Sequence, residues 1–186
     1  MDILLYGGTF NPPHLGHTAA AKTAFEILRP DMLIWMPSVV PPHKALPPGS
    51  PDALHRLEMT HLAAETGVVS DLEITGGTRY TYDTVEALKK LYPGAEITVL
   101  MGGDMLKTLH TWHRSAELFA VCRAAALTRD GTKPVSGEFN ALLLPHTPLE
   151  ISSTRLRDML PRGEGREYLP RAVWEYIRQN KLYGVP

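Results

Sequence analysis

The sequence lacks the features of secreted and membrane proteins. Its 186 residues include a single cysteine, Cys122, so no disulfide can form within the chain, as is usual for proteins of a reducing compartment. No apolar run approaches the roughly 18 residues of a membrane span. The beginning of the chain is acidic at position 2 and only briefly apolar, unlike a secretion signal. We therefore expect a cytoplasmic protein with no membrane partner.

The sequence also lacks an excess of charge of one sign. It has 19 basic and 20 acidic residues, for a formal net charge of −1, which argues against a nucleic-acid partner but leaves room for a local phosphate site. The hydrophobic share of 44% and charged share of 21% are ordinary for globular proteins and exclude a disordered chain or a coiled coil. The length predicts one domain over 1–186, with the helical part from about 151 to 186 packed on it. The oligomeric state stays open, a homo-oligomer included.

Short apolar runs alternate with helical segments along the chain. Residues 2–6 form an apolar run ended by glycines, and a glycine- and proline-rich turn then leads into an alanine-rich helical segment. A second run, 32–36, completes a strand–helix–strand unit typical of parallel sheets. We expect further strands at 68–74, 96–101, 123–128 and 140–144, and helices at 52–66, 82–92, 104–109, 115–121, 153–161 and 170–181. The alternation predicts an α/β fold with a doubly wound, mostly parallel sheet of five or six strands.

Two histidines follow the first predicted strand. His14 and His17 are three residues apart at the start of a helix, so their rings lie near one side of its first turn. Free N–H groups at a helix start attract anions, and a bound phosphate raises the pKa of an imidazole. Gly16 between them leaves room for a ligand. The alternatives are a structural histidine pair or a metal site, for which no third ligand is evident nearby. We favour phosphate binding.

A second polar motif lies near the end of the chain. Ser152, Ser153 and Thr154 come just before an amphipathic helical segment, where a hydroxyl serves as the N-cap. Capping explains one hydroxyl, but it does not explain Arg155 and Arg157 in the first turns, where the helix dipole favours acidic residues. Cations fit there if an anion binds there too. The motif therefore predicts a second phosphate contact.

The two motifs together resemble a known family. The stretch from Gly8 to His17 resembles the GxFDxxHxGH signature of the nucleotidyltransferase α/β-phosphodiesterase superfamily, and Ile151 to Arg157 resembles its ISSTxIR signature. Further motifs recur in the order seen in nicotinate-nucleotide adenylyltransferases: Pro42-His43-Lys44, Tyr80 to Thr84, Gly102-Gly103-Asp104, Thr111-Trp112 and the ending from Val173 to Tyr183. The resemblance covers nearly the whole chain and implies a Rossmann-like nucleotidyltransferase fold.

The resemblance implies an activity and a set of site residues. The family transfers the adenylyl group of ATP to nicotinate mononucleotide, a step of NAD biosynthesis, by direct in-line attack without a covalent intermediate. Catalysis then rests on positioning and charge stabilisation. Mg²⁺ would ride on ATP, with no metal site on the protein. The implied catalytic residues are His14, His17 and Arg157; the implied ATP-binding residues are Gly8, Thr9, Phe10, Gly16, Lys44 (on the proline-rich loop of 37–51), Gly103, Asp104, Ser152, Ser153 and Thr154.

The mononucleotide is expected to bind Thr84, Trp112 and Tyr82. Trp112 would stack on the pyridine ring, and Thr84 would bind the carboxylate through its hydroxyl and its backbone N–H. Trp112 in the core and Asp104 as an N-cap are the structural alternatives. Nicotinamide mononucleotide or another phosphate acceptor remains an alternative substrate.

The chain departs from the signature at one position. It has Asn11 where the signature has Asp, which removes a charge and admits a third hypothesis, a non-catalytic nucleotide-binding module. Three other histidines, His55, His61 and His146, are interpreted as packing or surface residues.

Overall fold

A parallel sheet forms the centre of the protein. The computed structural model describes residues 1–39, 45–129 and 139–185. Six strands pair in the order β3-β2-β1-β4-β5-β6, and each neighbouring pair is parallel. The strands are β1 (Asp2–Gly8), β2 (Met32–Pro37), β3 (Val68–Val69), β4 (Glu96–Gly102), β5 (Arg123–Thr128) and β6 (Leu142–Pro145). The prediction of a doubly wound parallel sheet is confirmed, with six strands.

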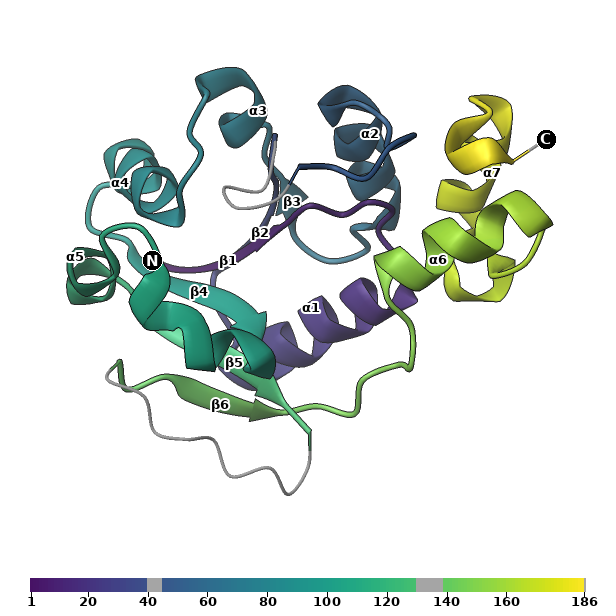
Figure 1. The fold of residues 1–186 in the computed structure, drawn as a ribbon. Coiled ribbons are helices and arrows are strands. Elements are labelled where there is room, and N and C mark those ends of the chain that lie inside the picture. Colours follow the sequence, from purple (N-terminus) through teal and green to yellow (C-terminus); the bar gives the residue numbers. More distant parts are fainter. Residues whose placement is uncertain (40–44, 130–138, 186) are drawn as a thin grey trace.

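Helices surround this sheet (Figure 1). The α-helices are α1 (Leu15–Leu28), α2 (Ala53–Ala63), α3 (Leu72–Gly76), α4 (Thr81–Leu91), α5 (Ser115–Val121), α6 (Ser153–Met159) and α7 (Arg171–Gln179). The 3-10 helices are η1 (Gly103–Thr111), η2 (Leu160–Arg162), η3 (Arg166–Tyr168) and η4 (Leu182–Gly184). No helix in the described ranges is long and apolar enough to cross a membrane.

Successive side chains of β1 point to opposite faces of the sheet and enter two separate cores. Ile3 and Leu5 belong to one apolar cluster, and Leu4 and Tyr6 to the other, as the two-residue period of a strand requires. A buried strand therefore reads as a continuous apolar run. This explains why β1, β2 and β4 were recognisable from sequence.

A third apolar cluster joins the carboxyl-terminal helices to α2. It contains Met59 of α2, Leu156 of α6, and Val173 and Ile177 of α7. In Figure 1 these helices lie together at one side of the molecule, with α7 beside α2. The cluster fixes α6 beside α2 and α7, and Ser153 of α6 then reaches the loop before α1 through the Pro12 carbonyl.

The prediction of a strand over 68–74 is largely wrong. Only Val68 and Val69 pair with β2, and Leu72–Gly76 form the short helix α3. Leu72 and Ile74 alternate with polar residues as a strand would, but one turn of helix also gives this pattern when only one of them, Leu72, packs on the core. The segment expected as a helix at 104–109 is the 3-10 helix η1, and α6 ends at Met159 before continuing as η2.

The strand order changes direction at the centre of the sheet. β1 lies between β2 and β4, so the chain moves outward first on one side and then on the other. The carboxyl ends of β1 and β4 are Gly8 and Gly102. At such a switch point the loops diverge and leave a crevice for a ligand.

Candidate active site

A cleft of about 1120 Å³ lies at this switch point. Its walls come from the start of α1, from η1, from the end of β5 and from the segment between β6 and α6. Its lining includes His14, Gly16, His17, Gly103, Asp104, Lys107, His110, Arg129, His146, Ser152 and Ser153. The structure thus brings both sequence motifs to one cavity, although they are more than 130 residues apart.

The two predicted histidines stack against each other at the start of α1. Their ring centroids are 3.8 Å apart, with an angle of 31° between the planes. The backbone N–H of His14 donates to Nδ1 of His17 at 3.2 Å. Since Nδ1 of His17 accepts a hydrogen bond, its proton is on Nε2. His17 therefore presents an N–H donor, as an anion in the cleft requires.

Burial keeps both imidazoles neutral. It lowers the pKa of His14 from 6.5 to about 4. Burial also lowers the pKa of His17 well below its ordinary value, and the neighbouring His14 lowers it further. Nδ1 of His14 is buried without a hydrogen-bond partner among the described residues. A buried polar atom of this kind is costly unless a ligand satisfies it.

The space around the histidines depends on small and aromatic neighbours. A Cβ atom at Gly16 would lie 2.9 Å from the His14 ring, and one at Gly8 would lie 2.8 Å from the Phe10 ring. Phe10 is 2% exposed, and its ring meets that of His17 edge-on at 5.2 Å. Gly16 is therefore needed for the imidazole itself. Phe10 does not line the cleft, but it packs against His17, which does.

Side chains from α2 and α6 hold the carbonyl oxygens of the loop between β1 and α1. The guanidinium of Arg157 donates to the Asn11 carbonyl at 2.7 Å, and the Ser153 hydroxyl donates to the Pro12 carbonyl at 2.8 Å. The fully buried Arg56 donates to the Thr9 carbonyl at 2.8 Å. Each bond connects this loop to a distant part of the chain, and their shared effect is to fix the loop's shape.

The residues predicted for ATP divide into two groups in the structure. Ser152 caps α6 by accepting a hydrogen bond from the Arg155 N–H, and it lines the cleft together with Ser153. Thr154 accepts a hydrogen bond from Arg157 at 3.1 Å. Five other predicted residues do not line the cleft: Gly8, Thr9, Phe10, Thr154 and Arg157. Lys44 lies outside the described residues.

Asp104 projects from the start of η1 into the cleft. The N-cap of η1 is Gly102, and no side chain caps it, so the alternative role of Asp104 as an N-cap does not apply. A Cβ atom at Gly102 would lie 2.5 Å from Oδ1 of Asp104, and one at Gly103 would lie 2.9 Å from the Leu127 carbonyl. The two glycines therefore let η1 approach β5 and let the carboxylate turn over the end of β4.

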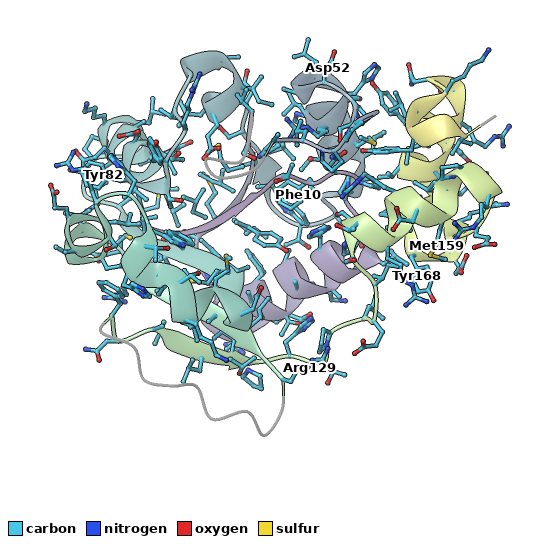
Figure 2. The ribbon with its side chains drawn as sticks, in the orientation of Figure 1. Phe10, Asp52, Tyr82, Arg129, Met159 and Tyr168 are labelled. Atoms are coloured by element: carbon cyan, nitrogen blue, oxygen red, sulfur yellow. The ribbon has the colours of Figure 1, made fainter. Side chains whose placement is uncertain are left out.

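The residues predicted for the mononucleotide lie outside this cleft. Figure 2 shows Tyr82 on α4, well away from Phe10 and Arg129. Its ring lies under the Arg114 guanidinium, 3.9 Å from the ring centroid. Trp112 is half-buried against the core and faces Phe119, so its environment is closer to the core alternative than to an open site edge.

Thr84 is buried, and its polar groups have partners within the protein. Its hydroxyl lies 2.8 Å from Glu73, and its backbone N–H donates to the Tyr80 carbonyl at 3.1 Å. The N–H expected to bind a carboxylate is thus part of the helix. The first backbone donors without a helical partner in α4 belong to residues 81–83.

Sequence reasoning missed four residues of the cleft. Lys107, His110, Arg129 and His146 all line it. His146, interpreted from the sequence as a packing or surface residue, lines the cleft, and its Nδ1 lies 3.2 Å from the Thr23 hydroxyl. Burial lowers its pKa. The four residues come from η1, from the end of β5 and from the segment after β6, so the strand order brings them to the site and no local motif signals them.

The metal alternative for the histidine pair has no support within the described ranges. These contain no group of three histidine, cysteine, aspartate or glutamate side chains placed to hold a metal ion. Among the described lining residues Asp104 is the one carboxylate.

Known proteins resemble this chain along its full length. A family model described as cytidylyltransferase-like matches residues 5–159. The nicotinate-nucleotide adenylyltransferase of Bacillus subtilis is 33% identical over 184 residues, covering 96% of each chain. A probable nicotinate-nucleotide adenylyltransferase of Exiguobacterium sibiricum is 38% identical over 193 residues, covering 100% of each.

The fold matches a solved structure. The Plasmodium falciparum nicotinic acid mononucleotide adenylyltransferase, complexed with NaAD, superposes with a TM-score of 0.79 at 18% identity, covering 100% of this chain and 98% of that one. With the paired motifs, the six-stranded sheet and the cleft at its switch point, these similarities place the chain in the nicotinate-nucleotide adenylyltransferase family of cytidylyltransferase-like nucleotidyltransferases.

Proposed function

We propose that the cleft is the active site in which this protein transfers the adenylyl group of ATP to nicotinate mononucleotide, giving nicotinate adenine dinucleotide and pyrophosphate. The observation that carries the proposal is the meeting of the stacked histidines with Ser152 and Ser153 in one cavity. The cavity is large enough for a nucleotide. The full-length similarity to named adenylyltransferases supports the choice of reaction.

The triphosphate would lie between the start of α1 and the start of α6. Nε2–H of His17 and the free backbone donors of the first turn of α1 would bind its oxygens. Ser152 and Ser153 would approach from the other side, while Arg157 holds the loop between β1 and α1 through the Asn11 carbonyl. As negative charge develops on the departing pyrophosphate, these donors stabilise it more than they stabilise bound ATP, which is the requirement for catalysis.

The reaction needs no nucleophile from the protein. The phosphate of the mononucleotide attacks the α-phosphorus of ATP in line, the bond to the pyrophosphate oxygen breaks, and pyrophosphate leaves. The protein positions both substrates and stabilises the negative charge that develops on the departing pyrophosphate. Asp104 at the end of β4 is placed to accept hydrogen bonds from ribose hydroxyls of ATP.

Mg²⁺ would enter as part of the substrate. The lining offers Asp104 as the one described carboxylate, which is too few protein oxygens for a dedicated site. Mg²⁺ retains several waters and is satisfied by phosphate oxygens with one or two carboxylates at most. Such an arrangement fits MgATP better than a resident metal.

The acceptor would bind beyond the cleft, near the start of α4. Here Tyr80 stacks on His113, with centroids 4.2 Å apart, and Arg114 covers Tyr82.

Pyrophosphate release with ATP and Mg²⁺ tests the function. Release with nicotinate mononucleotide, and much slower release with nicotinamide mononucleotide, is the expected result. Equal rates with both would support adenylyl transfer but would contradict recognition of the nicotinate carboxylate at Thr84 and Trp112. No release with either would refute the proposed reaction.

A further inference from the structure

The side-chain amide of Asn11 joins three segments that are far apart in the sequence. Its Oδ1 accepts a hydrogen bond from the Tyr183 hydroxyl at 2.8 Å, and its Nδ2 donates to the Ser50 hydroxyl at 2.9 Å. Asn11 is 2% exposed and Tyr183 is 7% exposed. The amide thus has one donor and one acceptor in use, and its bond with Tyr183 is buried where solvent cannot replace the hydroxyl.

The same residue belongs to the loop that shapes the proposed phosphate site. The backbone carbonyls of Asn11 and Pro12 accept hydrogen bonds from Arg157 and Ser153. Two residues further along, His14 begins the helix whose first turn faces the cleft. A shift of Asn11 would therefore move Arg157, Ser153 and the histidine pair together.

The turn that carries Tyr183 has an unfavourable backbone. Lys181 and Tyr183 have φ angles of 50° and 55°, in the left-handed region that side chains other than glycine rarely adopt. Such a conformation persists where surrounding contacts hold it, and it concentrates at functional positions. It turns the Tyr183 ring inward, where its hydroxyl meets Asn11. Burial raises the pKa of this phenol, so the hydroxyl keeps its proton and remains a donor.

We propose that Tyr183 and Asn11 are positioning residues for the phosphate-binding loop, so that the turn at 182–184 sets the affinity for ATP. This inference rests on the proposed ATP site in the cleft. It also explains the departure from the family signature: asparagine supplies Tyr183 with the acceptor that aspartate would supply, and it additionally donates to Ser50.

The test is ATP affinity in Tyr183→Phe, measured by titration calorimetry with MgATP and no acceptor. The change removes one hydroxyl and leaves Oδ1 of Asn11 buried without its donor, and we expect about tenfold weaker binding. The matched control is Tyr176→Phe, because the Tyr176 hydroxyl contacts His55 at 2.8 Å in the same group of helices but does not touch the loop. The control should bind MgATP within about twofold of the unmodified protein.

A second pair of variants guards against a general loss of folding. Asn11→Asp keeps an acceptor for Tyr183 and can accept from Ser50, so MgATP binding should stay within about threefold; Asn11→Ala loses both bonds and should lose at least tenfold. Adding Tyr183→Phe to Asn11→Ala should cause no further loss, since the two residues act through one contact.

Equal MgATP binding by Tyr183→Phe and Tyr176→Phe would overturn the inference, as would independent, additive losses from Tyr183 and Asn11. The outcome is separable from the reaction assignment. If the unmodified protein binds MgATP but does not use nicotinate mononucleotide, the proposed function fails while the affinity comparison still decides the role of Tyr183. In steady-state assays of Tyr183→Phe, the KM for ATP should rise and the KM for the mononucleotide should stay unchanged.

Discussion

Replacing His14 by glutamine should remove a large part of the acid sensitivity of the free protein. Burial lowers the pKa of His14 from 6.5 to about 4 in the folded protein, while in the unfolded chain it returns to the ordinary value. Between these two values the unfolded chain binds more protons than the folded one. Stability contributed by the neutral imidazole is therefore fully present above about pH 7 and is lost as the pH falls from 6.5 towards 4.

The size of this effect follows from the two pKa values. For a single group with pKa values of 6.5 unfolded and about 4 folded, the free energy of unfolding falls by about 2 kcal/mol between pH 7.5 and pH 5. His17 adds a loss of the same sign, since burial lowers its pKa too. Glu73 works in the opposite direction, because burial raises its pKa to about 7. Only the difference between the unmodified protein and His14→Gln isolates His14.

Urea unfolding at pH 7.5 and at pH 5 measures that difference. The unmodified protein should lose about 2 kcal/mol more than His14→Gln over this interval. Identical losses in the two proteins would refute the buried, neutral state of His14. A companion measurement follows ATP binding at pH 6 in two buffers of different ionisation enthalpy. Phosphate oxygens beside the rings should raise the pKa of the histidines, so binding should take up protons.

Three further substitutions test the site. His17→Ala should lower kcat by roughly 10²–10³ through loss of one donor to the transition state, with little change in melting temperature; parallel losses of activity and melting temperature would contradict this. Gly16→Ala should lower activity at least tenfold, because the new Cβ meets the His14 ring at 2.9 Å, while Gly7→Ala, with nothing within 4 Å, should behave as the unmodified protein in the same assay. Trp112→Ala should raise the KM for the mononucleotide several-fold and leave the KM for ATP unchanged; an unchanged mononucleotide KM, with lowered stability, would assign Trp112 to the core.

The fold was predictable where strands are buried on both faces. β1, β2 and β4 appear in the sequence as continuous apolar runs followed by glycine, serine or proline, and all three lie at the centre of the sheet. The edge strand β3 has two residues, and its sequence does not distinguish a short strand from a short helix. Its pairing with β2 is a tertiary contact, which overrides local preference there.

The site was predictable where local sequence fixes both the turn and the chemistry. His14, Gly16 and His17 belong to one turn, so their meeting needs no knowledge of the rest of the chain. His146 and Lys107 reach the same cleft from other strand ends, and only the strand order brings them there. The role of Asn11 was hidden for the same reason, since its partners are 39 and 172 residues away.

The hydrogen bond between Asn11 and Tyr183 has a consequence for synthesis on the ribosome. The loop that begins the site is made before its partner, which follows 172 residues later. At about 5–20 residues per second the loop waits roughly 10–30 s for it. During that interval β1, α1 and β2 can already pack, since their contacts are local. The sheet can thus form progressively as the chain emerges, whereas the loop around Asn11 is completed only after Tyr183 has been made. A ribosome that stalls just before residue 183 would hold a chain with most of its sheet and without a finished nucleotide site.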